Sequence, residues 1–175
     1  MCQTFMPRPG REAVVPRMFT PEFLPRALNH VSATYLLDSA CAQFEPDDPD
    51  YIRVVHNVYD DIDKKGAYDE LHSTRFFGGL VFYLVCVARL DGLILDRLKR
   101  GKLSEAADVV RLLNILHPKS ACALETGRTQ ESLTDVRMVE IFIETMAKDA
   151  VVVKLRTALG SMAGEAEKDS VAIKQ

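Results

Sequence analysis

The sequence predicts an all-α fold: a single-domain bundle of about five helices around a central apolar helix at residues 73–100. Apolar residues recur at helical spacing along most of the chain, and no segment alternates apolar and polar residues convincingly, as a strand would. Residues 76–88 contain no charged side chain, which is typical of a helix buried on all sides. The 175 residues, 47% of them apolar, are enough for one domain with a sizeable core.

We expect the chain to divide into three parts. Residues 1–19 contain three prolines and no periodicity, so they are predicted to form an extended N-terminal arm. They also lack a continuous apolar stretch, which argues against a secretory signal. Residues 20–160 should form the helical bundle domain, and the small, polar residues 161–175 a mobile C-terminal tail.

Start and stop signals delimit the first two helices. The first is predicted to begin at Thr20, a hydroxyl cap followed by proline and an acid, or at Pro25, and to run to about Phe44. The second should begin after Asp48, a capping acid followed by proline. It should end at Gly66, which directly follows two lysines.

The third helix is predicted to begin after Ser73 or Thr74 and to end at Gly101. Its apolar part, residues 76–95, should be the buried centre of the bundle. Two adjacent glycines, 78 and 79, should let a neighbouring helix approach closely. A membrane span is not expected, because the thirteen uncharged residues fall short of the about 20 that a span requires.

Two further helices are predicted in the C-terminal half. Ser104 should cap a fourth helix that Pro118 terminates. Residues 119–132 should form a loop, and a fifth helix should run from about Gln130 to Leu159. The β-branched stretch at 149–155 leaves a strand open as an alternative within that last helix.

Charge and cysteine content exclude several classes of protein. The net charge of −3 does not suit a chain that binds nucleic acid over its whole surface. The acids concentrate at residues 45–70 and the bases at 71–128. None of the four cysteines has CxxC spacing, which indicates reduced, buried thiols in a reducing compartment rather than a disulfide framework or a zinc site.

One pair of side chains has the spacing of metal ligands. His56 and Asp60 are four residues apart on the predicted second helix and could share a face, while Asp69 and His72 lie further along. A di-metal bundle needs a fuller set of glutamates and histidines. We therefore interpret this face as acidic and solvated, and we expect no metal, no cofactor and no catalytic residue.

A basic cluster lies at the end of the predicted third helix. Positive charge there complements the helix dipole, but it also offers a possible nucleic-acid contact. The cluster consists of Arg97, Lys99, Arg100 and Lys102. It lacks the interleaved aromatic residues typical of single-strand binding.

The segment YIRVVHNVYDDIDKK, residues 51–65, resembles the BH3 helix of Bcl-2-family proteins. The apolar spacing of Val55, Val58 and Ile62 and an acidic pair after Tyr59 carry the resemblance. It implies a regulator that binds amphipathic helices. Tyr59 stands where that family has a small residue, and the chain has no tryptophan.

The predicted C-terminal helix is apolar over more than one face. A face wider than its own bundle needs indicates a partner interface, and symmetric pairing of two copies would cover it. The residues that widen this face are Met138, Ile141, Phe142, Val152 and Leu155. The alternative is a central helix buried on both sides.

These observations favour a non-enzymatic, cytoplasmic module for protein–protein interaction or self-assembly, most simply a homo-oligomer. Three alternatives remain open. The first is a capsid- or nucleocapsid-like assembly protein that uses the basic cluster and the N-terminal arm. The second is the Bcl-2-like regulator, and the third is a metal-dependent enzyme that uses His56 and Asp60.

Overall fold

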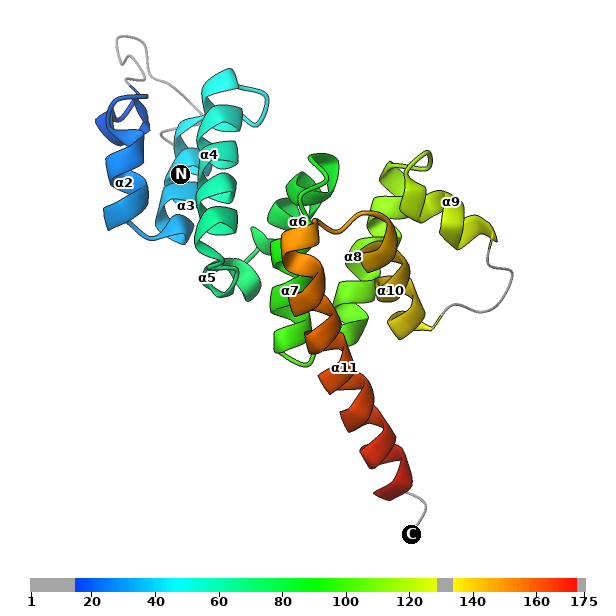
Figure 1. Cartoon of the computed structure of the whole chain (residues 1–175). Helices are drawn as coiled ribbons and strands as arrows, with labels where there is room; N and C mark the ends of the chain where they lie inside the picture. The colour runs from blue at the N-terminus through cyan, green and yellow to red at the C-terminus, as the bar shows by residue number, and fades with distance from the viewer. Residues whose placement is uncertain (1–14, 129–133, 173–175) are drawn as a thin grey trace. The chain divides into compact units, whose positions relative to one another are not determined.

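The computed structural model describes residues 15–128 and 134–172, with side chains up to residue 161. Those residues form ten α-helices and one 3-10 helix, and they contain no strand (Figure 1). The all-α prediction is therefore confirmed. The five-helix bundle is wrong, because three of the long helices expected from the sequence are each divided into shorter ones.

The chain separates into two compact units, Met1–Tyr83 and Leu84–Gln175. The sequence predicts one bundle domain over residues 20–160. The boundary between the units falls inside helix α6 (Phe77–Cys86), the segment expected to be the centre of a single bundle. Each unit has its own set of packed helices and its own buried apolar side chains.

The first unit packs helices α2 and α3 against α4, and α5 against α3 (Figure 1). Its core includes several side chains that are almost completely buried, among them Phe19, Leu36, Leu37, Val54, Val58 and Leu71. Its elements are η1 (Arg17–Phe19), α2 (Leu24–His30), α3 (Ala33–Gln43), α4 (Pro49–Lys65), α5 (Asp69–His72) and the first part of α6.

Local signals explain most helix ends in this unit. Asp48 caps α4 as predicted, with its carboxylate accepting a hydrogen bond from the Asp50 N–H at 2.8 Å, and Gly66 ends α4 in the left-handed conformation. The helix expected over residues 20–44 is instead two helices. Pro25 lies in the first turn of α2, and Ser32 caps α3 by accepting from the Tyr35 N–H.

The apolar run at residues 76–88 is not one long helix. It ends at Ala88, whose φ of 52° is left-handed. The Ala88 N–H donates to the Val85 carbonyl and the Arg89 N–H to the Leu84 carbonyl, both at 3.0 Å, which is the bonding of a Schellman helix end. The central helix over 73–100 is therefore wrong: α6 stops at Cys86, and α7 (Asp91–Lys99) follows after a turn.

The second unit packs α10 against α8, α9 and α11, and α7 against α8 and α11. Its helices after α7 are α8 (Leu103–Leu116), α9 (Ala121–Arg128), α10 (Asp135–Thr145) and α11 (Asp149–Ala172). Part of the expected loop at 119–132 is thus helix α9. The fifth predicted helix is interrupted after Thr145, and the stretch at 149–155 is helical rather than a strand.

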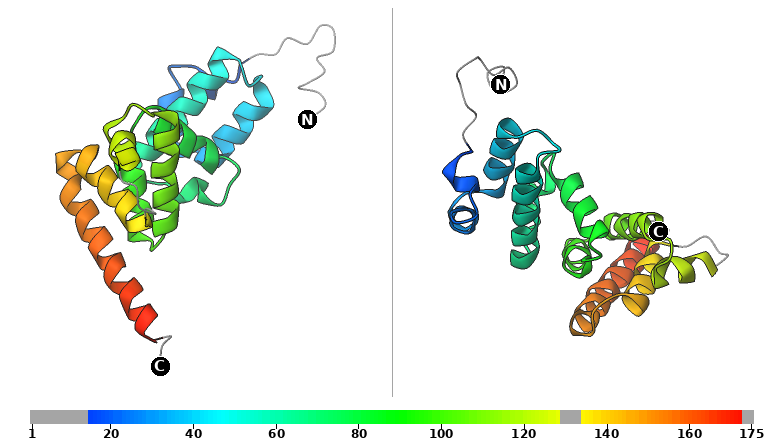
Figure 2. Two further views of the ribbon diagram at one scale, coloured as in Figure 1. Left: turned by 90° about the vertical axis from the view of Figure 1, so that its right-hand side faces the viewer. Right: turned by 90° about the horizontal axis from the view of Figure 1, so that it is seen from above.

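The segment expected to be a mobile tail from residue 161 is helical in backbone up to Ala172. It is the last part of α11, which continues past the helices it packs against (Figure 2). Most of the expected N-terminal arm and residues 129–133 lie outside the described residues. Among the described cysteines, Cys122 is buried, whereas Cys86 is exposed, against the expectation of burial. No helix within the described ranges combines the length and apolar character needed to cross a membrane.

Candidate functional site

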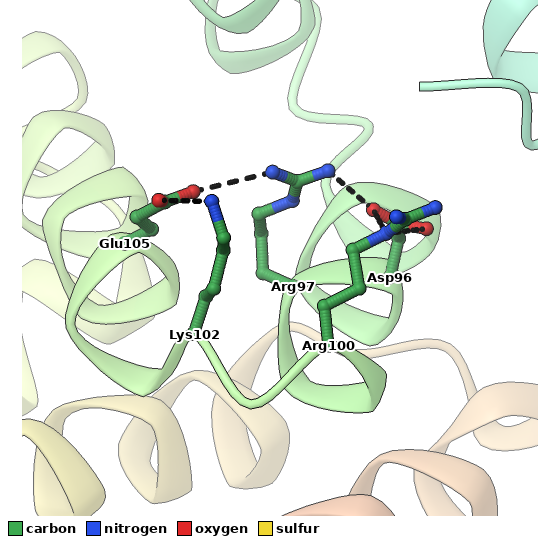
Figure 3. A network of polar contacts seen from close by, with 5 residues as sticks. All are labelled: Asp96, Arg97, Arg100, Lys102 and Glu105. Carbon is green, nitrogen blue, oxygen red and sulfur yellow. Dashed lines mark hydrogen bonds and ion pairs between the residues drawn. The ribbon is translucent and has the colours of Figure 1, made fainter. Parts of the chain in front are cut away.

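Three bases of the cluster singled out from the sequence, Arg97, Arg100 and Lys102, take part in an ion-pair network between α7 and α8 (Figure 3). Arg97 is only 1% exposed, and its guanidinium donates to Asp96 at 2.5 Å and to Glu105 at 3.2 Å. A guanidinium with five donors is suited to joining two carboxylates from different helices. The burial of Arg97 makes it a link between two helices, and it cannot reach a nucleic acid from this position.

Two other bases of the cluster bind the same carboxylates. Arg100 donates to Asp96 at 2.9 Å, and Lys102 donates to Glu105 at 2.8 Å (Figure 3). The hydrogen bond from Lys102, with further help from Arg97, lowers the pKa of Glu105. Much of the positive charge read from the sequence is therefore neutralised within the second unit. A nucleic-acid contact by the exposed Lys99 and Arg100 stays a prediction.

The proposed metal ligands on α4 lie beside a tyrosine. The Tyr83 hydroxyl donates to the Asp60 carboxylate at 3.0 Å, and the His56 ring lies 4.5 Å from the Tyr83 ring, measured between centroids. The His72 ring packs against Phe77. Within the described ranges, no three or more histidine, cysteine or acidic side chains are grouped to hold a metal ion.

The apolar face that carries the BH3 resemblance is directed into the first unit. Val55, Val58 and Ile62 are all buried. Tyr59 is buried as well, its hydroxyl donates to the Phe76 carbonyl at 3.4 Å, and burial raises its pKa. The α4 stripe is thus part of the unit's own core.

The residues proposed as a partner interface are mostly covered by the second unit itself. Val152 is half-buried, and the other four are buried, namely Met138, Ile141, Phe142 and Leu155. These side chains lie on α10 and α11, which pack against each other and against α7, α8 and α9. This burial agrees with the alternative expected from the sequence, in which the helix is covered on more than one side by its own domain.

A basic hollow that the sequence reasoning missed lies at η1 and α2. It has a volume of about 410 Å³ and is lined by Arg17, Met18, Phe23, Arg26, Ala27 and His30. The Arg17 guanidinium lies 5.7 Å from the centroid of the Phe23 ring, and Phe23 as a residue is 41% exposed. An aromatic residue between two arginines of one short segment is the signal in the sequence that could have identified it.

The sequence of this chain is similar to that of one family of known proteins. The family model described as mitochondrial 28S ribosomal protein S22 matches residues 1–118. The small ribosomal subunit protein mS22 of Bos taurus is 37% identical over 155 residues, which cover 89% of this chain and 43% of the relative. The Mus musculus mS22 protein is 34% identical over 153 residues, 87% of this chain and 42% of the relative. The chain thus spans less than half the length of either relative.

These matches overturn several expectations drawn from the sequence. A mitochondrial ribosomal family does not fit a self-assembling homo-oligomer, a capsid-like protein, a Bcl-2-like regulator or a metal-dependent enzyme. The description of the family as mitochondrial also contradicts the expected cytoplasmic location. The sequence reasoning failed here because a ribosomal component needs no catalytic motif, and its binding surfaces have no fixed residue spacing.

Proposed function

Because the chain belongs to the mitochondrial 28S ribosomal protein S22 family, we propose that it is a structural component of the small subunit of the mitochondrial ribosome. The match over residues 1–118, two thirds of the chain, is the observation that carries this proposal. In this role the chain is non-catalytic. It presents fixed surfaces to RNA and to protein neighbours inside one heteromeric particle.

Exposed apolar side chains support this role. Ile115 on α8 is 73% exposed and Leu124 on α9 is 54% exposed, and these two helices pack against each other. Large aliphatic side chains left open to water suit a protein whose surface is covered in an assembly. The covering partner in this proposal is a different chain, because the family is that of a ribosomal protein.

Sedimentation tests the proposal directly. We expect the full chain, tagged and expressed in cells of its source organism, to be recovered from mitochondria and to co-sediment with small-subunit ribosomal RNA in a sucrose gradient containing magnesium. A tagged matrix enzyme of similar mass is the control and should remain near the top. If the chain also remains at the top, or is recovered from the cytosol, the proposed function is wrong.

A further inference from the structure

We propose that the hollow at η1 and α2 is a binding site for single-stranded RNA. In this site Phe23 stacks on an unpaired base, and Arg17 and Arg26 bind the adjacent phosphates. The inference rests on the proposed function, because a ribosomal component is a chain to which RNA is available. It adds a named site and a mode of recognition.

The first observation is the unusual state of the two arginines. Elsewhere in the first unit, Arg53 pairs with Asp50 at 2.6 Å and Arg75 pairs with Asp38 at 2.5 Å. No carboxylate among the described residues forms an ion pair with Arg17 or Arg26, and both side chains are exposed. Two guanidinium groups that open on one hollow and form no ion pair with a described carboxylate favour an anionic ligand.

The second observation is the aromatic ring in the same hollow. Phe23 keeps much of its face open to solvent although it lies within cation–π distance of Arg17. Exposed aromatic rings next to a positively charged groove are how single-stranded nucleic acids are held, because any base can stack on them. His30 adds a further hydrogen-bonding side chain to the lining.

The third observation is that the backbone of the site is held in place before any ligand binds. The Phe23 N–H donates to the Thr20 carbonyl at 3.1 Å, and the Thr20 hydroxyl donates to the Arg17 carbonyl at 2.8 Å. The Arg53 guanidinium donates to the carbonyl of Phe19, a residue whose side chain is fully buried. A site ordered in advance loses less conformational entropy on binding.

Other occupants fit the hollow less well. An acidic peptide would pair with the arginines but would leave the Phe23 ring without a stacking partner. An apolar helix would cover Phe23 but would desolvate two guanidinium groups without an acceptor, which is costly. A single-stranded RNA supplies both phosphates and bases.

Fluorescence anisotropy with the full chain and a labelled oligouridine of about 12 nucleotides tests the site. Replacing both arginines, Arg17→Gln with Arg26→Gln, should weaken binding at least about tenfold. It should also reduce the dependence of log K on log salt by about 1.4, which is about 0.7 for each lost phosphate contact. Phe23→Leu should weaken binding about 5- to 150-fold and leave that salt slope unchanged, because it removes a stacked base and no charge.

Two matched variants control for general effects. Arg75→Gln removes an exposed arginine that is already paired, so binding should change less than about twofold. Phe23→Trp keeps an aromatic face and should preserve or strengthen binding. All the substituted side chains of the hollow are exposed, and circular dichroism with a thermal melt should show each variant folded.

Three results would overturn the inference. One is a double-arginine variant that loses no more affinity than Arg75→Gln. Another is a Phe23→Leu variant that binds as well as the wild-type chain. The third is an oligoglutamate peptide of similar length that displaces the RNA at equal concentration, which would assign the hollow to an acidic protein segment. If the wild-type chain co-sediments with the small subunit while these variants bind RNA normally, only this inference fails. If the wild-type chain does not co-sediment, the proposed function fails first.

Discussion

Gly78 and Gly79 are adjacent in α6, but only one of them lies against another side chain. A β-carbon at Gly79 would lie 2.6 Å from the Tyr59 hydroxyl oxygen of α4, whereas one at Gly78 would meet nothing within 4 Å. Tyr59 is buried, so its ring has little room to move aside. The expectation that both glycines permit close helix packing therefore applies to Gly79 alone.

At this residue scale, we expect Gly79→Ala to lower the free energy of unfolding by about 1–3 kcal/mol, because the added methyl group overpacks the contact with Tyr59. Gly78→Ala should raise it by up to about 1 kcal/mol, because alanine is the better helix former. Urea denaturation measures both.

The same clash predicts a rescue. In the Gly79→Ala background, Tyr59→Phe should recover part of the loss, because the next ring atom lies 3.6 Å from the new methyl position, an ordinary contact. Equal effects of alanine at both glycines, or the absence of any rescue, would contradict the assigned contact.

At the scale of helices, three helix ends share one hydrogen-bonding arrangement. The chain turns left-handed at Gly66 after α4, at Gly101 after α7 and at Ala88 after α6, with φ of 66°, 75° and 52°. Glycine adopts this conformation without cost, but alanine brings its β-carbon near a carbonyl oxygen. The end of α6 is therefore the strained member of the three.

Relief of that strain is expected from Ala88→Gly. The variant should be more stable by about 1 kcal/mol, with a higher midpoint of thermal unfolding. Ala42→Gly, at an exposed helical position in α3, is the control and should lower stability. If Ala88→Gly lowers stability instead, residue 88 does not adopt the left-handed conformation between the end of α6 and the start of α7.

The link between α7 and α8 predicts a dependence on pH. Because Lys102 and Arg97 hold the pKa of Glu105 below its usual value, the ionised carboxylate stabilises the fold above the unfolded pKa of about 4.3. This contribution is lost as the pH falls through the lower folded pKa. Glu105→Gln should therefore cost stability at pH 7, by less than about 1 kcal/mol because the carboxylate is partly exposed and screened.

Denaturation at several pH values tests the link. The difference between the wild-type chain and Glu105→Gln should narrow as the pH falls below the unfolded pKa of about 4.3, and it should close once Glu105 is protonated in the folded chain. Glu22→Gln, at an exposed carboxylate without an ion pair among the described residues, should show no such difference. A gap that stays the same size as the pH falls through the acid range would mean that the cost of the substitution is not electrostatic.

At the scale of the whole molecule, two units replace the expected single bundle, and each is stabilised by its own core. Phe142 on α10 is only 2% exposed within the second unit. From the sequence, this residue was expected to lie at an interface between two copies of the chain. Its burial against the unit's own helices makes it a determinant of folding rather than of association.

This assignment predicts that Phe142→Ala lowers the free energy of unfolding by about 3–5 kcal/mol and leaves the molar mass measured by light scattering unchanged. Leu124→Ala, at an exposed position on α9, should change stability by less than about 0.5 kcal/mol. If Phe142→Ala keeps the wild-type stability but shows a lower molar mass by light scattering, Phe142 lies at an interface between chains instead.

Local sequence signals determined the helical class of the chain and several of its helix ends. The cap at Asp48 and the stops at Gly66 and Gly101 were predictable, because they depend on hydrogen bonds between residues at most five positions apart. The helix start predicted from Ser104 was close in position, but the predicted cap was wrong: α8 begins at Leu103, Lys102 precedes it without a side-chain cap hydrogen bond, and Ser104 lies inside the helix. Comparable signals at two other helix starts were missed: the Thr134 hydroxyl accepts from the Arg137 N–H at the start of α10, and the Ser120 hydroxyl accepts from the Ala123 N–H at the start of α9.

Only the tertiary structure decided which faces are covered and which charges are neutralised. Arg97 reads as a surface base, yet packing of α7 on α8 buries it against Asp96 and Glu105. The stop at Ala88 carries no glycine signal and occurs between Leu84 and Leu90, which are both buried. The hollow at η1 and α2 depends likewise on two arginines that form no ion pair with any described carboxylate. Burial and charge pairing depend on which helices meet, and the periodicity of a single helix does not specify its partner.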